Sequence, residues 1–372
     1  MKSEDSASFI VPYNDLSRIH SELQEEFIDS LKEVLENSDF ILGSGVSAFE
    51  NAYAELEQAK NVVTVNSGTS ALILILKSLG IGPGDEVLVP AMTFVATAFA
   101  VTAVAATPKL IDVDEKTGLM NLSHLTESIS KKTKAAIFVT LHGRVDNLDS
   151  FYTICRDNKI YSVIDAAQSH LGTFDSSSQV KYSDATSVSF YPGKNLGALG
   201  EGGAVLTDNS TIAERIRVFR NWGGSSNYDH SNWGGNFRLE TLQCLFLLSK
   251  LKHLSNWTRV RQALGARYRS ALPKELLLDD ISAQGSHVYH IFALRHPNKI
   301  AFRNYLEDHG IKTSTHYPKP IHLHSAYKEF GGRGLELRGS EVFAANTISI
   351  PIYPHLKDSE FSRIVEVISN FG

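Results

Sequence analysis

The chain has 372 residues, of which 36 are basic and 41 are acidic, and its formal net charge is −5. A chain of this length is expected to form two lobes, or one large domain with an appendage. The net negative charge provides no general attraction for nucleic acid or anionic lipid, so neither partner is expected. Its only cysteines are Cys155 and Cys244, which excludes a disulfide scaffold and a cysteine-rich zinc module.

The first nine residues lack the features of a secretory signal peptide. They are polar and acidic, with neither the basic start nor the apolar stretch that such a signal needs. The low cysteine content agrees with a reducing compartment. We therefore expect a cytoplasmic protein.

An N-terminal arm and seven short apolar runs organise the first two thirds of the chain. Residues 10–60 have apolar residues at three- and four-residue spacing, which predicts helices. The apolar runs, separated by helical patterns, lie at 62–66, 86–90, 108–114, 134–140, 160–165, 185–190 and 202–207. This alternation predicts an α/β domain whose mainly parallel sheet is covered on both faces and binds ligands at its carboxyl edge.

One stretch imitates a membrane span. Residues 87–107 contain no charged side chain, and this uncharged stretch is long enough for a transmembrane helix. However, Pro90 divides the stretch into a strand-like and a helical part, and Pro108 opens another strand-like run. We therefore expect a buried strand-helix-strand unit and no membrane partner.

The pattern changes after about residue 221. A long helical stretch to Arg269 is followed by strand-like runs at 287–296 and 348–354, which alternate with helical patterns. This change predicts a smaller C-terminal α+β domain. We expect an arm and large domain over residues 1–235, and the smaller domain over residues 236–372.

Two motifs are weighed and set aside. The sequence GSGVSA at 43–48 matches the G-x-G-x-x-A dinucleotide fingerprint, but no acidic residue lies near position 65, where a ribose-binding carboxylate belongs. His322 and His324 could form a metal-binding pair on one side of a strand. Ordinary polar or substrate-contacting histidines are the preferred interpretation, and no metal site is expected.

A phosphate site and a buried carboxylate are predicted at the sheet edge. The segment Ser67-Gly68-Thr69-Ser70 lies between a predicted strand and a helix, where free backbone N–H groups and the helix dipole favour a phosphate. Asp165 ends another strand, where a carboxylate could keep an aromatic ring nitrogen protonated. The alternative for Asp165 is a helix N-cap.

A lysine in a glycine-rich turn completes the pattern. Ser189 ends the next strand, and Lys194 follows in a turn that would aim it into the ligand crevice. A Schiff-base lysine needs such a partly desolvated place because its amine must be neutral to attack. Phe94 could stack on the same flat ring, although core packing is its alternative. Together these groups describe a site for pyridoxal 5′-phosphate (PLP).

At this point the chain resembles a known family, the fold-type I, PLP-dependent sugar aminotransferases of the DegT/DnrJ/StrS type. The resemblance covers nearly the whole chain. It is carried by FILGSGVSAFE (40–50), NSGTSAL (66–72), GDEVLVPAMTFVATAFAV (84–101), IDAAQSHLG (164–172), SFYPGKNLGALGEGGAV (189–205), RNWG (220–223), NFRLETLQ (236–243) and HYPKPIHLHSAY (316–327).

The resemblance implies how the cofactor ring is held. Lys194 would form the Schiff base with PLP and carry the proton between the cofactor and the sugar carbon. Asp165 would pair with the pyridine nitrogen. Gln168 would contact the ring hydroxyl, and Phe94 would stack on the ring face.

The resemblance also implies the remaining contacts and a homodimer. Gly68, Thr69 and Ser189 would hold the phosphate, and Asn236 would reach in from the neighbouring subunit, so that each active site is shared. Three further side chains match positions near the sugar pocket: His170, Tyr317 and His322.

Within the family, the chain is most similar to enzymes that aminate C3 of a nucleotide-linked sugar. The carrying residues are 189–200, His170 and Gly143-Arg144. The implied reaction moves an amino group from L-glutamate, through pyridoxamine 5′-phosphate (PMP), to a dTDP-linked 3-keto-6-deoxyhexose.

Several alternatives stay open. These are a 4-keto sugar or cyclitol aminotransferase of the same family, a PLP-dependent sugar dehydratase, and a non-catalytic PLP-fold sugar-binding regulator. The dehydratases of this scaffold carry histidine in place of the lysine, so Lys194 argues against that reading. His142, Phe237 and Cys244 depart from the residues usual in the family, which leaves the sugar open but not the cofactor.

Overall fold

The computed structural model describes residues 10–224, 229–330 and 337–371. The interpretation of the first nine residues as lacking a signal peptide lies outside this part of the chain. None of the helices in the described ranges is both long and apolar enough to cross a membrane.

A seven-stranded sheet forms the centre of the large domain, with the strand order β1-β10-β9-β6-β4-β2-β3. Its strands are β1 (Asn61–Val65), β2 (Glu86–Pro90), β3 (Thr107–Ile111), β4 (Thr133–Val139), β6 (Tyr161–Asp165), β9 (Ala185–Ser189) and β10 (Gly203–Thr207). Only β10 runs antiparallel to its neighbours; every other pair is parallel. All seven predicted strands are confirmed, because near-continuous apolar runs suit strands that are buried on both faces.

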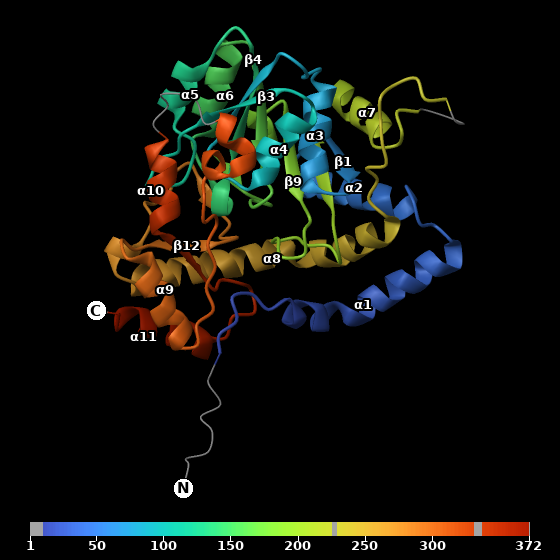
Figure 1. Ribbon diagram of the computed structural model, residues 1–372. Helices are drawn as coiled ribbons and strands as arrows, with labels where there is room; N and C mark the ends of the chain where they lie inside the picture. Colours follow the sequence, from blue (N-terminus) through green and yellow to red (C-terminus); the bar gives the residue numbers. More distant parts are fainter. Residues whose placement is uncertain (1–9, 225–228, 331–336, 372) are drawn as a thin grey trace.

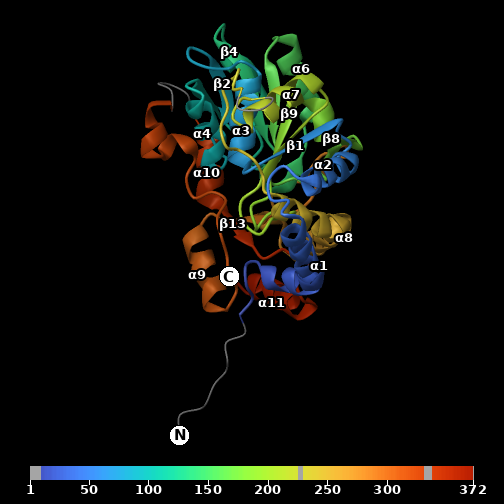
Figure 2. The ribbon, with the colours of Figure 1, turned by 90° about the vertical axis from the view of Figure 1, so that its right-hand side faces the viewer.

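Helices cover both faces of this sheet (Figures 1 and 2). One face packs against α2 (Ser44–Leu56), α5 (Leu122–Ser128), α6 (Leu148–Asp157) and the start of α8 (Thr241–Ala271). The other face packs against α3 (Gly68–Ser78), α4 (Val95–Ala103) and α7 (Ser210–Phe219). The predicted α/β architecture is therefore confirmed.

The uncharged stretch at 87–107 is the expected strand-helix-strand unit. It forms β2, α4 and the start of β3, and β2 pairs with β3 in parallel. Strand β2 contributes Val87 and Val89, and α4 contributes Ala98 and Val101, to a single buried cluster. Most of the apolar side chains of this stretch are therefore buried in the large domain, as a strand-helix-strand unit requires.

The C-terminal part has a core of its own. Strands β12 (Phe292–Arg295) and β13 (Thr347–Ile350) pair antiparallel. They pack with the end of α8, α9 (Lys299–Asp308) and α11 (Asp358–Ser369), as Figure 1 shows in orange and red. Two other C-terminal elements, η4 (Ile321–Leu323) and η5 (Ser325–Phe330), instead place Ile321 and Tyr327 in a cluster of the large domain.

The N-terminal arm lies along the C-terminal elements. Helix α1 (Leu16–Asn37) packs against α8 (Figure 1). Ile19 and Leu23 of α1 form a buried cluster there with Trp257 of α8. The remaining elements are α10 (Arg338–Asn346), β5 (Arg144–Val145), β7 (Thr173–Phe174), β8 (Ser177–Ser178), β11 (Ser286–His287), η1 (Leu141–Gly143), η2 (Gln179–Tyr182) and η3 (Lys274–Leu276).

The GSGVSA motif has a structural role. Gly43 is the N-cap of α2, and an isolated bridge between Ile41 and Glu240 precedes it in place of a sheet strand. A dinucleotide fingerprint requires a strand, a tight turn and a helix. Residues 38–48, all of which the structure describes, lack that context.

Candidate active site

A cavity of about 630 Å³ opens at the carboxyl edge of the large sheet, between the sheet and the C-terminal elements. It brings together residues at or just after the carboxyl ends of five strands, β1, β2, β4, β6 and β9, and residues from the second lobe. Eight of the residues expected from the sequence line it: Gly68, Thr69, Phe94, Asp165, Gln168, Ser189, Lys194 and Tyr317.

One end of the cavity presents the start of helix α3. The Ser67 hydroxyl accepts the N–H of Ser70 at 3.0 Å, as an N-cap does. The N–H groups of Gly68 and Thr69 belong to the first turn, where no carbonyl of the helix can accept them. Glycine is required at position 68, because a Cβ there would lie 2.7 Å from the Cβ of Ser189. This end suits a phosphate group.

Asp165 ends β6 with its carboxylate buried. Its oxygens accept a hydrogen bond from the Thr97 hydroxyl at 2.9 Å and from the Ala167 N–H at 3.2 Å. Burial raises the pKa of Asp165, and these two hydrogen bonds and the nearby Lys194 oppose the rise. No helix follows within 166–172, so the alternative of a helix N-cap is wrong. A buried carboxylate on a cavity wall favours a cationic ligand group.

Lys194 is held in the turn that follows β9. Its backbone N–H donates to the carbonyl of Tyr191 at 2.8 Å, and its half-buried side chain lines the cavity. Burial lowers the pKa of Lys194 to about 8, while the charge of Asp165 acts in the opposite direction. About a tenth of the amine is therefore neutral at pH 7, and the neutral form is the one that a nucleophilic lysine requires.

Aromatic and amide groups form another part of the cavity wall. Phe94 is 54% exposed although it lies in a cavity, and its ring centroid lies 5.5 Å from that of Tyr317. The Gln168 amide donates to the Tyr317 hydroxyl at 3.0 Å and accepts the His142 N–H at 2.5 Å. A flat ligand ring would cover the exposed face of Phe94.

These residues fit PLP on three independent grounds. The glycine at position 68 leaves open a helix start that can receive the phosphate. The buried Asp165 carboxylate suits a protonated ring nitrogen. Lys194, with its depressed pKa, suits a covalent link to the cofactor aldehyde.

Three expected site residues lie outside the cavity lining. His170 is fully buried, and its ring nitrogens contact the Tyr53 hydroxyl and the Ser189 carbonyl. His322 contacts Glu341 at 2.9 Å. Asn236 is exposed, and its side-chain oxygen accepts a hydrogen bond from Arg238.

The structure does not complete a metal site around His322 and His324 within its described ranges. Among the residues that the structure describes, no group of three or more His, Cys, Asp and Glu side chains is arranged to hold a metal ion.

The second lobe adds polar groups that the sequence analysis missed. Arg261 of α8 is 4% exposed and lines the cavity beside His290 and His316. One of its guanidinium nitrogens donates to the carbonyls of Tyr289 and Ile352. No local motif marks Arg261, since it is one of several basic residues along a long helix.

Comparison with known proteins identifies the family. The sequence profile of the DegT/DnrJ/EryC1/StrS aminotransferase family matches residues 21–369. The dTDP-3-amino-3,4,6-trideoxy-alpha-D-glucose transaminase of Streptomyces venezuelae is 36% identical over 364 residues, which cover 97% of this chain and 96% of that protein.

Solved structures agree with the sequence match. The crystal structure of S. venezuelae DesV in complex with a ketimine intermediate has a TM-score of 0.93 at 35% identity, covering 96% of this chain and 97% of that one. NtdA from Bacillus subtilis with bound cofactor PMP has a TM-score of 0.90 at 28% identity, covering 99% of this chain and 86% of that one.

The chain therefore belongs to the DegT/DnrJ/EryC1/StrS aminotransferase family. It is a PLP-dependent aminotransferase, so the enzyme class and the cofactor expected from the sequence are confirmed.

Proposed function

We propose that the enzyme moves an amino group from L-glutamate to the keto carbon of a dTDP-linked 3-keto-6-deoxyhexose. The observation that carries this proposal is the single cavity in which Asp165 and Lys194 meet the start of α3. The S. venezuelae relative, whose name specifies a dTDP-3-amino sugar, supports the choice of substrate.

The residues of the large domain would divide the work of holding the cofactor. Gly68, Thr69 and Ser189 would bind the phosphate, Asp165 would bind the ring nitrogen, and Phe94 would cover the ring. Bound PLP supplies an electron sink that stabilises negative charge on the carbon next to the transferred nitrogen. Because Asp165 keeps the ring nitrogen protonated, it maintains that sink.

Lys194 would move the proton. Its Nζ can accept a proton from the substrate carbon and return it to the cofactor side, because a pKa near 8 allows both protonation states near neutral pH. Gln168 and Tyr317, which bond to each other at 3.0 Å, would orient the ring and the sugar.

We predict that borohydride reduction of the PLP-loaded enzyme fixes the cofactor on Lys194. Peptide mass mapping should find the pyridoxyl adduct there. Lys194→Ala should still bind PMP, because the phosphate, ring and stacking contacts remain, but turnover should fall by about 10²–10⁴-fold or more. An adduct on a different lysine would refute this role.

We predict the substrate from the reverse reaction, because 3-keto sugars are unstable. The enzyme should convert a dTDP-3-amino-3,6-dideoxyhexose and 2-oxoglutarate to glutamate, detected by mass spectrometry. Matched dTDP-4-amino and UDP-4-amino sugars should react much more slowly. Activity on a 4-amino sugar or an aminocyclitol alone would reassign the substrate while leaving the aminotransferase class intact.

The amino donor would be recognised by Arg261. Of the described residues that line the cavity, Lys194 and Arg261 are the cationic ones, since the pKa values of His290 and His316 are lowered by burial and by neighbouring positive charge. A guanidinium is the side chain best suited to a carboxylate, which it can bind through two parallel hydrogen bonds. We therefore assign a carboxylate of glutamate to Arg261.

We predict that Arg261→Lys raises the KM for glutamate and 2-oxoglutarate by roughly 10- to 100-fold, the effect of losing about 1.5–3 kcal/mol from a charged hydrogen bond. The KM for the amino sugar should change far less. Arg269→Lys is the matched control, because Arg269 lies on the same helix and donates to a backbone carbonyl outside the cavity. An equal loss for both substrates would show that Arg261 is structural only.

We also propose a homodimer in which Asn236 enters the partner's site. Its support is the exposed side chain of Asn236, which leaves it accessible to a second subunit. Asn236→Asp would place a negative charge near the cofactor phosphate, so PLP affinity should fall by roughly tenfold or more. Sedimentation should give a dimer for both proteins; a fully active monomer would contradict the proposal.

A further inference from the structure

A buried chain of hydrogen bonds lies behind the cavity wall. The Glu57 carboxyl contacts the Tyr53 hydroxyl at 2.9 Å, and that hydroxyl contacts Nδ1 of His170 at 2.7 Å. Nε2 of His170 then contacts the backbone carbonyl of Ser189 at 2.9 Å. The chain thus connects the end of α2 to the strand end from which the Lys194 turn begins.

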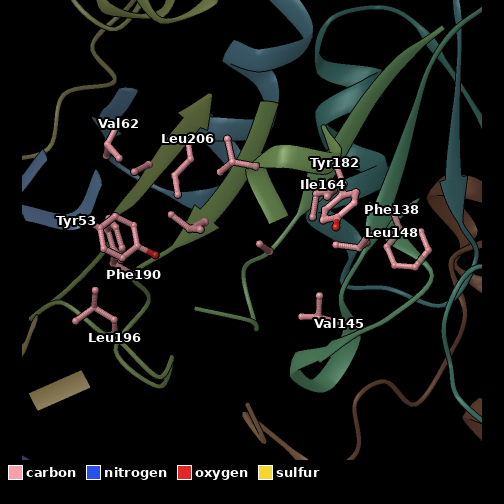
Figure 3. Packing of buried hydrophobic residues seen from close by; sticks show 14 of the residues in the cluster. Tyr53, Val62, Phe138, Val145, Leu148, Ile164, Tyr182, Phe190, Leu196 and Leu206 are labelled. Carbon is pink, nitrogen blue, oxygen red and sulfur yellow. The ribbon is translucent and has the colours of Figure 1, made fainter. Parts of the chain in front are cut away.

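This chain is shielded from water and surrounded by aromatic rings. Tyr53 and His170 are 0% exposed and Glu57 is 5% exposed. The Phe190 ring packs edge-on against Tyr53, at 5.6 Å (Figure 3). It also stacks on His170, at 5.7 Å. In such surroundings a missing hydrogen bond is costly, because water cannot replace it.

A count of hydrogens shows that this row of three hydrogen bonds needs an extra proton. The three contacts need one hydrogen each, and the Ser189 carbonyl supplies none. Tyrosine supplies one and a neutral imidazole supplies one. The third hydrogen must therefore be a proton bound by either Glu57 or His170.

Two arrangements of this proton satisfy all three contacts. In the first, a neutral Glu57 donates to Tyr53, Tyr53 donates to Nδ1, and Nε2–H donates to Ser189. In the second, Glu57 is a carboxylate that accepts from Tyr53, and a cationic His170 donates from both nitrogens. The Leu171 N–H also donates to the same oxygen of Glu57, at 2.9 Å. The proton therefore belongs to the pair.

We propose that Glu57, Tyr53 and His170 share one proton that fixes the Ser189 carbonyl, so that these three side chains position the Ser189–Lys194 segment. When the proton leaves, one of the three hydrogen bonds must break, and the strand end loses part of its support. The positioning role rests on the proposed function of Ser189 and Lys194. The shared proton does not depend on that function.

Burial and the neighbouring charges determine how the protonation of Glu57 and His170 changes with pH. Burial raises the pKa of Glu57 to about 7, and the hydrogen bonds from Leu171 and Tyr53 oppose the rise. Burial lowers the pKa of His170 to about 4, and the charge of Lys194 acts in the same direction. His290 is a further titratable neighbour of His170, and burial lowers its own pKa.

The raised pKa of Glu57 makes its bound proton a stabilising one. That stabilisation is complete below the ordinary pKa of a glutamate and is lost as the pH rises to about 7. His170 acts with the opposite sign, because its lowered pKa removes stability as the pH falls. Comparison with a variant that changes only Glu57 separates the two effects.

Glu57→Gln supplies the critical test, because its neutral amide nitrogen can donate the third hydrogen at every pH. The Leu171 N–H, which shares one oxygen of Glu57 with the Tyr53 hydroxyl, then loses its acceptor, and this loss does not depend on pH. In urea unfolding of the full-length protein, the unfolding constant of the wild type should therefore rise relative to that of the variant by up to about 10²-fold between about pH 5 and pH 8. A ratio that stays constant with pH would overturn the shared proton.

Glu55→Gln is the matched control, since Glu55 lies on the same helix and is exposed. It should follow the wild type at every pH. Should Glu57→Gln fail to fold, Tyr53→Phe provides the second test, because removal of the central hydroxyl disconnects the two ends. Tyr53→Phe should lower the free energy of unfolding. Because Glu57 then no longer contacts His170, the stability of the variant should lose the pH dependence that the shared proton gives the wild type.

The PLP-loaded enzyme tests the positioning role separately. The absorbance of the bound cofactor should show a transition near pH 7 in the wild type and in Glu55→Gln, and that transition should disappear in Glu57→Gln. A stability difference without this spectral change would refute the positioning of Lys194 while leaving the shared proton intact. Failure of the sugar assay alone would affect neither result.

Discussion

The structure depends on the burial of an acid and a base on the wall of one cavity. Burial raises the pKa of Asp165 and lowers that of Lys194, and each residue's charge opposes the shift of the other. The pair is therefore poised for a ligand that brings a cationic ring nitrogen for the acid and an aldehyde for the amine. The large sheet makes this possible because β6 and β9 are parallel neighbours whose carboxyl ends meet at one edge.

The second lobe converts this edge into a closed site. Helix α8 begins against the large sheet and ends in the C-terminal core, so it connects the two parts as one long element (Figure 1). It carries Arg261 to the cavity, and the loop after α9 brings Tyr317 against Phe94. The large domain thus contributes Asp165, Ser189 and Lys194 to the cavity, and the second lobe contributes Arg261 and Tyr317.

The wall behind the site is as constrained as the wall that faces the ligand. Gly68 and Ser189 approach so closely that a methyl group would not fit between them. On the other side, the Ser189 carbonyl contacts His170, which in turn contacts Tyr53, and Tyr53 contacts Glu57. A strand end that is fixed from two directions can present its hydroxyl and the following lysine with little freedom.

The sequence by itself determined the seven strands, the positions of Asp165 and Ser189 at strand ends, and the position of Lys194 in the turn after Ser189. It could do so because apolar runs and turn residues act locally. It could not place the His170 ring, which is buried in the core. The neighbouring residue Leu171 donates its backbone N–H to Glu57, which lies 114 residues away in the sequence, and this distant contact holds the turn that carries His170. Nor could the sequence place Arg261, because helical spacing does not reveal which distant carbonyls a guanidinium will meet. Contacts between segments far apart in the chain decided both, since burial at those points depends on how the layers pack.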